Sequence, residues 1–396
     1  MSNTSLPNQQ RQLLSCALVG AVVLACGFGF APERSWSNLL VAAFYLLTIA
    51  LGGAVFVALT YVSGGGWHVA FRRVPEAMAK MLPIAGTAML VILAVRMHDY
   101  GWHHHGQGDA GTFWFKELWL TPSFWATRAV VYVVLWSLMA GRLVARSKEQ
   151  DESGDKALTA SNTRLSALFL IVYAVTFSLA GVDWIMALEP MWFSTMWGVY
   201  NFAGMIQAAL AVMILLGLLL RTHNGPLHGV FNDEHLHDLG KLLLGFSCFW
   251  MYIWFSQYML IWYSNIPEET SYFISRTKGP WGPVVVASIV LNWIIPLFVL
   301  LPKPAKRNAG VMMKIAVVVL IGRWVDLYQM VFPASAFDMS EVPFGSTPVF
   351  GIWEVGGIVC LIGVAGSLLL RSFDAANSVP RSDPFLRESL SYHADG

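Results

Sequence analysis

The stretch DLGKLLLGFSCFWMYIWFSQYMLIWYSNIPEET, residues 238–270, decides the fold class of this chain. It has no proline before Pro267, and Lys241 is the one charged residue between Asp238 and Glu268. At about 1.5 Å per residue, a helix of this length is longer than the ~30 Å hydrocarbon core of a bilayer. The stretch therefore predicts a membrane-spanning helix.

Polar and aromatic residues recur along this helix at three- and four-residue spacing and so share one face. They are Cys248, Tyr252, Ser256, Met259 and Tyr263. A helix face in lipid gains nothing from such groups, so we expect this stripe to point into the protein. Ordinary helix packing is the alternative, since Tyr and Ser also bond neighbouring membrane helices.

The rest of the chain has the same character. Hydrophobic residues make up 56% of the 396 residues and charged residues 12%, against about 25% charged in soluble domains. The composition predicts an all-α integral membrane protein in contact with the lipid bilayer. A net charge of +1, without a basic stripe, excludes nucleic acid as a partner.

We expect ten transmembrane helices. They cover residues 13–31, 39–62, 81–99, 123–145, 164–188, 194–220, 239–263, 281–301, 310–331 and 348–370. The first run resembles a signal peptide, but its length favours a retained helix.

The distribution of Lys and Arg predicts the orientation. Four of them fall in loops on the side opposite the N-terminus: Arg34, Lys116, Arg276 and Lys278. Most others fall on the N-terminal side, so by the positive-inside rule both termini are cytoplasmic. We expect the polar linker Ser147–Asn162 to be mobile, and also the end of the cytoplasmic tail 371–396, from Ala375 onward.

The sequence predicts no redox centre and no metal site in this chain. The four cysteines lie in apolar runs without a CxxC motif, which excludes iron–sulfur ligation, c-type haem attachment and a disulfide framework. A di-haem cytochrome b needs facing histidines in the membrane, and His98 is the one histidine in an expected span. The run His103–His105 fits a solvated loop better than a metal site.

Ionisable residues within spans are energetically expensive and are therefore candidates for function. The candidates for a quinone site or a proton pathway are Asp183, His98, Asp99, Arg128, Arg323, Asp326 and Glu354, with Tyr263 added from the polar stripe. In the expected orientation all of them lie in the outer half of the membrane. The inner half is nearly free of buried charge, apart from Lys241.

Asp183 has no cation near it in sequence, although Arg128 could reach it across the bundle. An unpaired buried carboxylate exchanges protons near neutral pH, and the same argument applies to Glu354. We therefore expect Asp183→Asn to leave assembly intact and to lower turnover. Arg323 and Asp326 lie three residues apart, so a purely structural ion pair is the alternative there.

The adjacent residues His98 and Asp99 end the third expected helix. A His–Asp pair at the membrane boundary could take protons from a quinol hydroxyl. It could equally cap the helix.

Two short segments near the outer ends of helices resemble each other, Val182–Trp184 in the fifth helix and Trp324–Asp326 in the ninth. They suggest that helices two to five repeat as helices six to nine. A repeat of four helices keeps both units in the same orientation.

Three segments carry a resemblance to a known family: FSQYMLIWYSNIPEET at 255–270, Leu51–Met78 and Phe177–Gly204. They resemble the F subunit of bacterial alternative complex III, within the wider family of polysulfide-reductase and nitrite-reductase membrane anchors, and the resemblance covers essentially the whole chain. It implies two four-helix bundles, helices two to five and six to nine, plus two flanking helices.

The resemblance also implies a function. The chain would be a subunit of a quinol:cytochrome c oxidoreductase in the bacterial inner membrane, with quinol oxidised near the periplasmic face. Its partners would be a paralogous C-type membrane subunit, an iron–sulfur subunit and c-type cytochrome subunits, which hold the haems and clusters. No cofactor would be bound covalently, and a bound quinone, menaquinone or ubiquinone, is left open.

Three functions remain open at this stage. The chain could hold its own quinone pocket, or act as a scaffold and proton-conducting subunit without quinone, or be a secondary transporter. Transporters favour helices broken at mid-membrane. Pro296 is the one mid-span proline, so transport is the least favoured.

Overall fold

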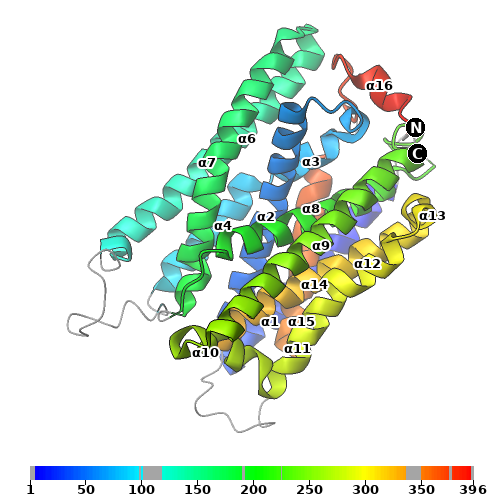
Figure 1. The fold of residues 1–396 in the computed structure, drawn as a ribbon. Helices are drawn as coiled ribbons and strands as arrows, with labels where there is room; N and C mark the ends of the chain where they lie inside the picture. The colour runs from blue at the N-terminus through cyan, green and yellow to red at the C-terminus, as the bar shows by residue number, and fades with distance from the viewer. Residues whose placement is uncertain are drawn as a thin grey trace.

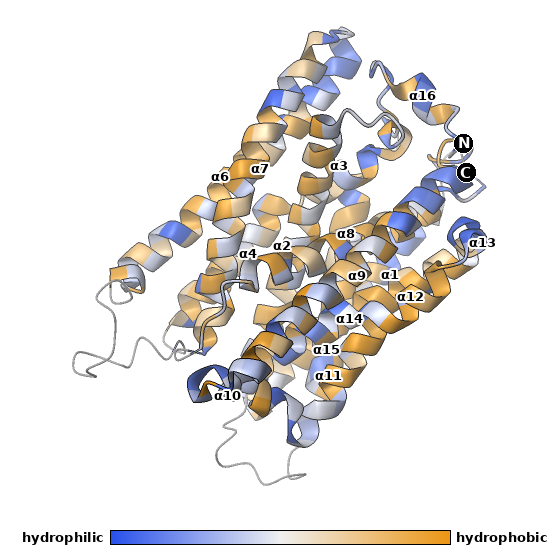
Figure 2. Cartoon of the chain, in the orientation of Figure 1, coloured by the Kyte–Doolittle hydropathy of each residue, from blue (hydrophilic) through white to orange (hydrophobic). Residues whose placement is uncertain are grey.

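The computed structural model describes residues 5–97, 100, 118–189, 192–223, 225–335, 349–373 and 377–393. Within these residues ten helical segments are long and apolar enough to cross a membrane, and none of the residues is in a strand. The long helices form one elongated bundle (Figure 1), and hydrophobic residues occur along most of its length (Figure 2). The prediction of an all-α membrane protein with ten spans is confirmed.

The helices are bounded as follows. Among the described residues, eight helices form the spans other than the third and eighth: α1 (Ser5–Phe30), α2 (Pro32–Ser63), α6 (Pro122–Ser153), α7 (Ala157–Trp184), α8 (Trp197–Leu220), α9 (Asp233–Ser264), α14 (Ala309–Ser335) and α15 (Ile352–Ser372). The short α10 (Pro267–Thr277) follows α9 and lies outside the spans. The third span joins α3 (Arg73–Ala79) to α4 (Leu82–Val95), and the eighth joins α11 (Gly282–Ile289) to α12 (Ile295–Leu300) through the π-helical turn Val290–Ile294. Short helices α13 (Lys303–Arg307) and α16 (Leu386–Leu390) lie outside the spans.

The described ends of the chain lie at the same end of the bundle, at the upper right in Figure 1. We call this the termini end and the other the opposite end. The short helices α13 and α16 lie at the termini end, and α10 lies at the opposite end.

The spans group into two bundles of four. Helix α2 contacts α4 and α7, and α6 contacts both α4 and α7, which closes the first bundle. Helix α8 contacts α9 and α14, while the α11–α12 span contacts α9 and α14, which closes the second. Helices α1 and α15 pair with each other and pack beside α2. This is the predicted arrangement of two bundles with two flanking helices.

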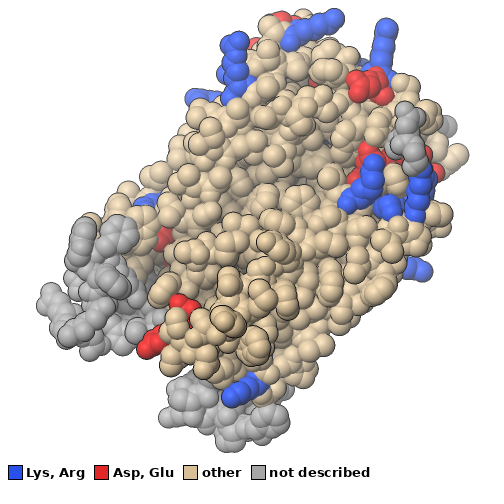
Figure 3. Space-filling model, in the orientation of Figure 1, with Lys and Arg blue, Asp and Glu red and all other residues tan. Residues whose placement is uncertain are grey.

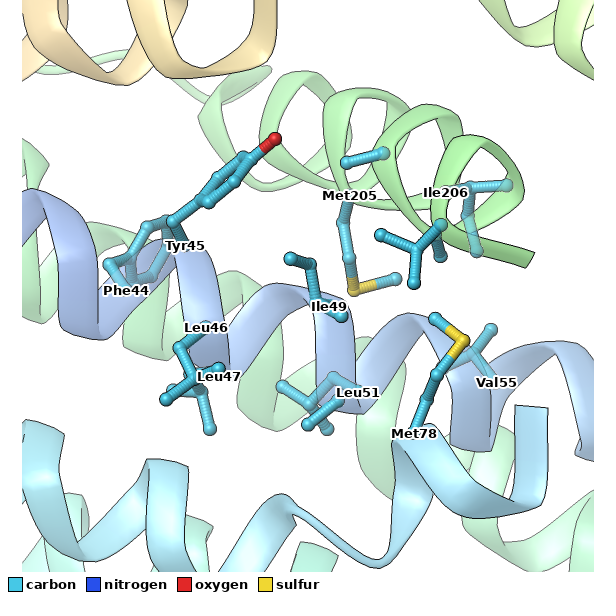
Figure 4. Packing of buried hydrophobic residues seen from close by; sticks show 14 of the residues in the cluster. Phe44, Tyr45, Leu46, Leu47, Ile49, Leu51, Val55, Met78, Met205 and Ile206 are labelled. Carbon is cyan, nitrogen blue, oxygen red and sulfur yellow. The ribbon is translucent and has the colours of Figure 1, made fainter. Parts of the chain in front are cut away.

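Helix α2 holds the two bundles together. In the apolar part of this span 94% of the residues are buried, because α8, α14 and α15 cover the faces that the first bundle leaves free. Figure 4 shows Ile49 and Val55 of α2 among Met205 and Ile206 of α8 and Met78 of α3. The core thus runs continuously from one bundle to the other.

The flanking pair α1–α15 packs by close backbone approach. A Cβ on Gly20 of α1 would lie 2.3 Å from the backbone nitrogen of Cys360, and one on Gly363 of α15 would lie 2.2 Å from that of Ala17. Small residues at such contacts are typical of helix association in membranes. The pairing therefore depends on these glycines.

The expectation that residues Ser147–Asn162 form a mobile linker is wrong. Helix α6 continues to Ser153 and α7 begins at Ala157, with Gly154 in the left-handed region at φ 71° between them. Ser147 and Asn162 are both fully buried. The polar residues continue the two helices because they have buried partners to bond, which composition alone does not reveal.

The expectation of a mobile tail is also wrong for residues 377–393, which lie across the termini end. Asp383 pairs with Arg72 of the first bundle at 2.6 Å between Oδ2 and Nη1. Tyr392 donates its hydroxyl to Asp238 of α9, in the second bundle, at 2.6 Å. The tail therefore links the two bundles.

Candidate functional site: two buried aspartate–arginine clusters

The first cluster lies in the first bundle and joins α6 to α7. Arg128 of α6 donates from Nε to Oδ2 of Asp183 at 3.1 Å and from Nη2 to Oδ1 at 2.9 Å. Both side chains are buried, with Asp183 1% exposed. The pairing of Arg128 with Asp183 across the bundle occurs as expected, so Asp183 is not an unpaired carboxylate.

Aromatic side chains enclose this pair. The Trp119 indole donates to Asp183 Oδ1 at 2.8 Å, and its ring centroid lies 3.9 Å from the guanidinium carbon of Arg128. The Trp125 indole donates to the Asp183 carbonyl at 3.0 Å, and Tyr132 donates to Oδ2 at 3.5 Å. Both carboxylate oxygens are thus bonded from several sides, an arrangement that holds a charge firmly in place.

Two polar residues on roughly the same face of α7 as Asp183, Thr176 and Tyr173, bond other partners. Thr176 accepts from the Trp136 indole at 2.8 Å, and Tyr173 donates to the sulfur of Met205 at 3.2 Å. Neither extends the cluster towards the termini end.

The second cluster lies in the second bundle, and its ion pair belongs to one helix. Arg323 and Asp326 of α14 form the expected i, i+3 salt bridge, and both side chains are 0% exposed. Asp326 also accepts the hydroxyl of Tyr200 from α8 and the indole of Trp250 from α9 at 3.2 Å. Gln329 donates to it at 3.1 Å.

A glycine makes room for the arginine of this cluster. Arg323 donates to the side-chain oxygen of Asn201 at 3.1 Å and lies against the next turn of α8. A Cβ on Gly204 would lie 2.4 Å from Arg323 Nη1. Tertiary packing on α8 therefore fixes where the guanidinium lies.

Uncharged polar groups continue from this cluster into the interior of the second bundle. Gln207 of α8 donates to the Ser247 hydroxyl of α9 at 2.9 Å and to the backbone carbonyl of Asn292 at 2.6 Å. Asn292 lies in the π-helical turn and donates to the Ser288 carbonyl at 2.9 Å. Wider turns of this kind occur frequently at functional sites.

Two oxygens in this amide cluster lack a partner among the described residues: Gln207 Oε1 and Asn292 Oδ1. Both side chains are fully buried. Gly322 of α14, next to Arg323, lies so close that a Cβ on it would be 2.9 Å from Asn292 Oδ1. The amide cluster therefore lies directly beside the second aspartate–arginine cluster.

A small cavity lies on another side of the second cluster. Its volume is about 20 Å³, and its lining includes Tyr200, Trp254, Gln257, Tyr272 and Gln329. In the described part of the chain Gln257 Nε2 and Gln329 Oε1 have no hydrogen-bond partner. A polar cavity of this size has room for about one water molecule.

Glu354 takes part in a different arrangement. It receives two hydrogen bonds from Arg34 of α2, at 2.9 and 2.6 Å, and one from the backbone N–H of Gly351 at 2.7 Å. The last bond makes Glu354 part of the N-terminal cap of α15. Its contacts tie α15 to α2, away from both clusters.

Tyr263 does not lie in a site within this chain, and the stripe of α9 points outward. Tyr263 is 84% exposed and Tyr252 64% exposed. The buried face of α9 holds Trp250, Ile253 and Gln257 instead. Spacing alone fits either face, and the larger apolar contacts of Trp250 and Ile253 determine which one is buried. His98 and Asp99 lie outside the described residues.

The termini end holds buried charge that the sequence analysis missed. Arg73 and Glu76 of α3 pair with each other, and Arg73 also pairs with Asp151. Ser147 donates to Glu76 Oε1 at 2.6 Å, and Glu76 is 1% exposed. The expectation of few buried charges in this half is wrong, because a short helix carries these residues inward from what reads as a loop.

The amides Gln207 and Asn292 were missed for another reason. A search for ionisable residues passes over them, although an amide within an apolar run is itself a signal of a buried polar contact. Ser247 supplies the hydroxyl group of this cluster.

Comparisons with known proteins identify no family for this chain. A scan against protein-family models found no match, and a search of curated proteins found none. The described residues contain no group of three or more His, Cys, Asp or Glu that could hold a metal ion.

Proposed function

We propose that this chain is a proton-conducting membrane subunit of a quinol:electron-acceptor oxidoreductase of the alternative complex III type. The observation that carries the proposal is the chain of buried polar groups in the second bundle, from the Tyr200–Asp326–Arg323 cluster to the amides Gln207 and Asn292. This makes the second bundle, rather than the first, the proposed pathway.

Burying such groups inside a membrane bundle is unfavourable unless they are bonded, and they mark ion or proton pathways by default. Gln207 Oε1 and Asn292 Oδ1 lack partners among the described residues, and each can accept a hydrogen bond from water. The Tyr200 hydroxyl bonds Asp326 and also borders the water-sized cavity. Water at these points would connect acceptors and donors into a relay.

The size of the cavity beside Asp326 supports proton transfer over quinone binding at this point. About 20 Å³ holds a water molecule, whereas ligand pockets usually measure about 300 Å³ or more. The proposal is therefore the scaffold and proton-conducting subunit, with quinol oxidised on a partner.

The proposed orientation places the termini end in the cytoplasm of a bacterial cell and the opposite end towards the periplasm. The proposed partners are the paralogous membrane subunit, the iron–sulfur subunit and the c-type cytochromes. Electron transfer takes place on those partners, and this chain moves protons.

The test uses Gln207→Leu, which removes the central amide without leaving an unpaired charge. In the assembled complex in liposomes we expect electron transfer to persist and the number of protons released per electron to fall. Thr176→Val, an uncharged change within the first bundle, is the matched control and should leave the ratio unchanged. A wild-type ratio in Gln207→Leu would contradict the proposed pathway, and one tightly bound quinone per chain would favour a quinone subunit instead.

A further inference from the structure

The loop between α12 and α14 forms a basic corner at the termini end of the second bundle. Lys303 and Arg307 of α13, with Pro304 and Asn308, line an open pocket of about 400 Å³. Figure 3 shows Lys and Arg side chains gathered near this corner. This pocket is separate from both aspartate–arginine clusters and from the amide cluster.

The local contacts leave positive charge at this corner. Arg307 is paired with Glu234 at 2.7 Å, and Lys241 is paired with Asp238 at 2.6 Å. Lys303 is exposed and has no carboxylate partner among the described residues. It is therefore available to an anion that enters the pocket.

The buried Lys306 adds to this positive charge. Its ammonium group donates to the last carbonyls of the eighth span, those of Leu300, Leu301 and Pro302, at 2.6, 3.2 and 3.3 Å. Burial lowers the pKa of Lys306, and the nearby cations Lys241 and Arg307 lower it further. Among the described residues, the Lys306 ammonium bonds these three carbonyls and forms no salt bridge with a carboxylate.

The surface next to the pocket is apolar. Phe298 and Leu301, at the end of the eighth span, are 70% and 65% exposed, and Met313 and Val317 of α14 are 48% and 43% exposed. The exposed Lys314 lies between them on α14. An occupant with an anionic head and apolar chains fits both parts of this surface at once.

We propose that this basic corner binds the head group of an anionic phospholipid, with its phosphate between Lys303 and Arg307 and its acyl chains along the exposed faces of α12 and α14. Basic pockets at the cytoplasmic boundary of membrane helices recognise such head groups. A free phosphate would use the same charges but would gain nothing from the apolar surface. The lipid therefore fits better than the free anion.

The experiment is thermal melting of the detergent-purified chain titrated with phosphatidylglycerol, with phosphatidylcholine as the neutral comparison. We expect phosphatidylglycerol alone to raise the melting temperature, and K303Q combined with K314Q to weaken its binding by about fivefold for each lysine removed. K156Q, at an exposed lysine of the helical turn between α6 and α7, is the matched control and should bind as the wild type does.

Three results would overturn the proposal. They are equal stabilisation by the two lipids, unchanged affinity in the double variant, and equal stabilisation by glycerol phosphate, which would assign a free-anion site. If the double variant fails to fold, the salt dependence of phosphatidylglycerol binding to the wild-type chain tests the proposal. Binding of phosphatidylglycerol that does not weaken between 50 mM and 500 mM salt would contradict a charge-based site.

Discussion

The aspartates of the two clusters lie on the last span of each bundle, yet the clusters are built differently. In the first bundle the ion pair joins two helices, Arg128 on α6 and Asp183 on α7. In the second, Arg323 and Asp326 belong to the same helix, and the neighbouring helices contribute only neutral donors and acceptors such as Tyr200.

In the function that we propose, this difference distinguishes an ion pair that holds a bundle together from one that lies on a proton pathway. A pair between helices, enclosed by indoles, fixes the helices relative to each other, and breaking it leaves a buried charge. The pair of the second bundle lies within one helix and is joined to α8 and α9 by hydrogen bonds with neutral groups, which can exchange partners without leaving a buried charge unpaired. Among the described residues, the second cluster lies beside buried amides with unpartnered oxygens, Gln207 and Asn292.

The largest expected effect comes from removing both members of the ion pair in the second bundle. Arg323→Met with Asp326→Leu removes both charges together and leaves no unpaired charge, so the bundle should still fold. Quinol oxidation on a partner itself releases one proton per electron, so we expect the proton release beyond that ratio to fall by about a hundredfold or more, the scale on which a positioned proton carrier acts. The measurement is the rate of proton release by the assembled complex.

The matched variant removes the pair of the first bundle by Arg128→Met with Asp183→Leu. It should assemble and keep proton release near the wild-type rate. Equal losses in the two double variants would show that the clusters have the same role, which would remove the distinction between the bundles.

The next largest effect concerns stability. Asp183→Asn leaves the Arg128 guanidinium buried without its counter-ion, which should destabilise the chain by about 3 kcal/mol. This replaces the expectation from sequence alone that the substitution leaves assembly intact, since that expectation assumed a carboxylate without a partner. Melting of the purified chain measures the effect, and the apolar double variant should melt at a higher temperature than Asp183→Asn.

The sequence predicts well those features that depend on long averages. Ten spans follow from hydropathy over about twenty residues, which the membrane itself selects. The pair Arg128–Asp183 could be anticipated because few charges are available within the spans to neutralise one another. The i, i+3 pair of Arg323 and Asp326 follows from helix geometry alone.

Features that depend on one face or one contact could not be predicted. The stripe containing Tyr263 was placed inward, since three- and four-residue spacing defines a face without saying which neighbour covers it. Glu76 reads as a loop residue because its helix α3 is only seven residues long. Its burial depends on Ser147, about seventy residues away in the chain.

A smaller effect tests whether the position of Arg323 matters. In Gly204→Ala the new methyl group would meet Arg323 Nη1, so the guanidinium must move away from Asn201. We expect a loss of about 2 kcal/mol, as for other overpacked interiors, together with slower proton release. Gly245→Ala is the matched control, because a Cβ at Gly245 in α9 has no atom within 4 Å. Equal behaviour of the two variants would mean that the cluster tolerates displacement.

The smallest expected effect is a pH dependence of stability that arises from His68, a residue outside both clusters. His68 lies between α2 and α3 at the termini end, and burial, with the nearby charge of Arg72, lowers its pKa to about 3. In the unfolded chain its pKa is near the ordinary value of about 6.5. The folded state therefore binds its proton less readily, and the stability that this provides is complete above about pH 6.5 and declines as the pH falls towards 3.

At pH 5.5 this linkage amounts to about 1.4 kcal/mol relative to alkaline pH. His68→Gln does not titrate, so melting curves of the variant and the wild type should converge or cross as the pH is lowered from 7.5 to 5.5. The rate of proton release per folded complex should be the same in both proteins across this range, because His68 is not part of the second cluster. A pH profile of proton release that changes in His68→Gln would connect the termini end to the pathway and would extend it beyond the second bundle as described.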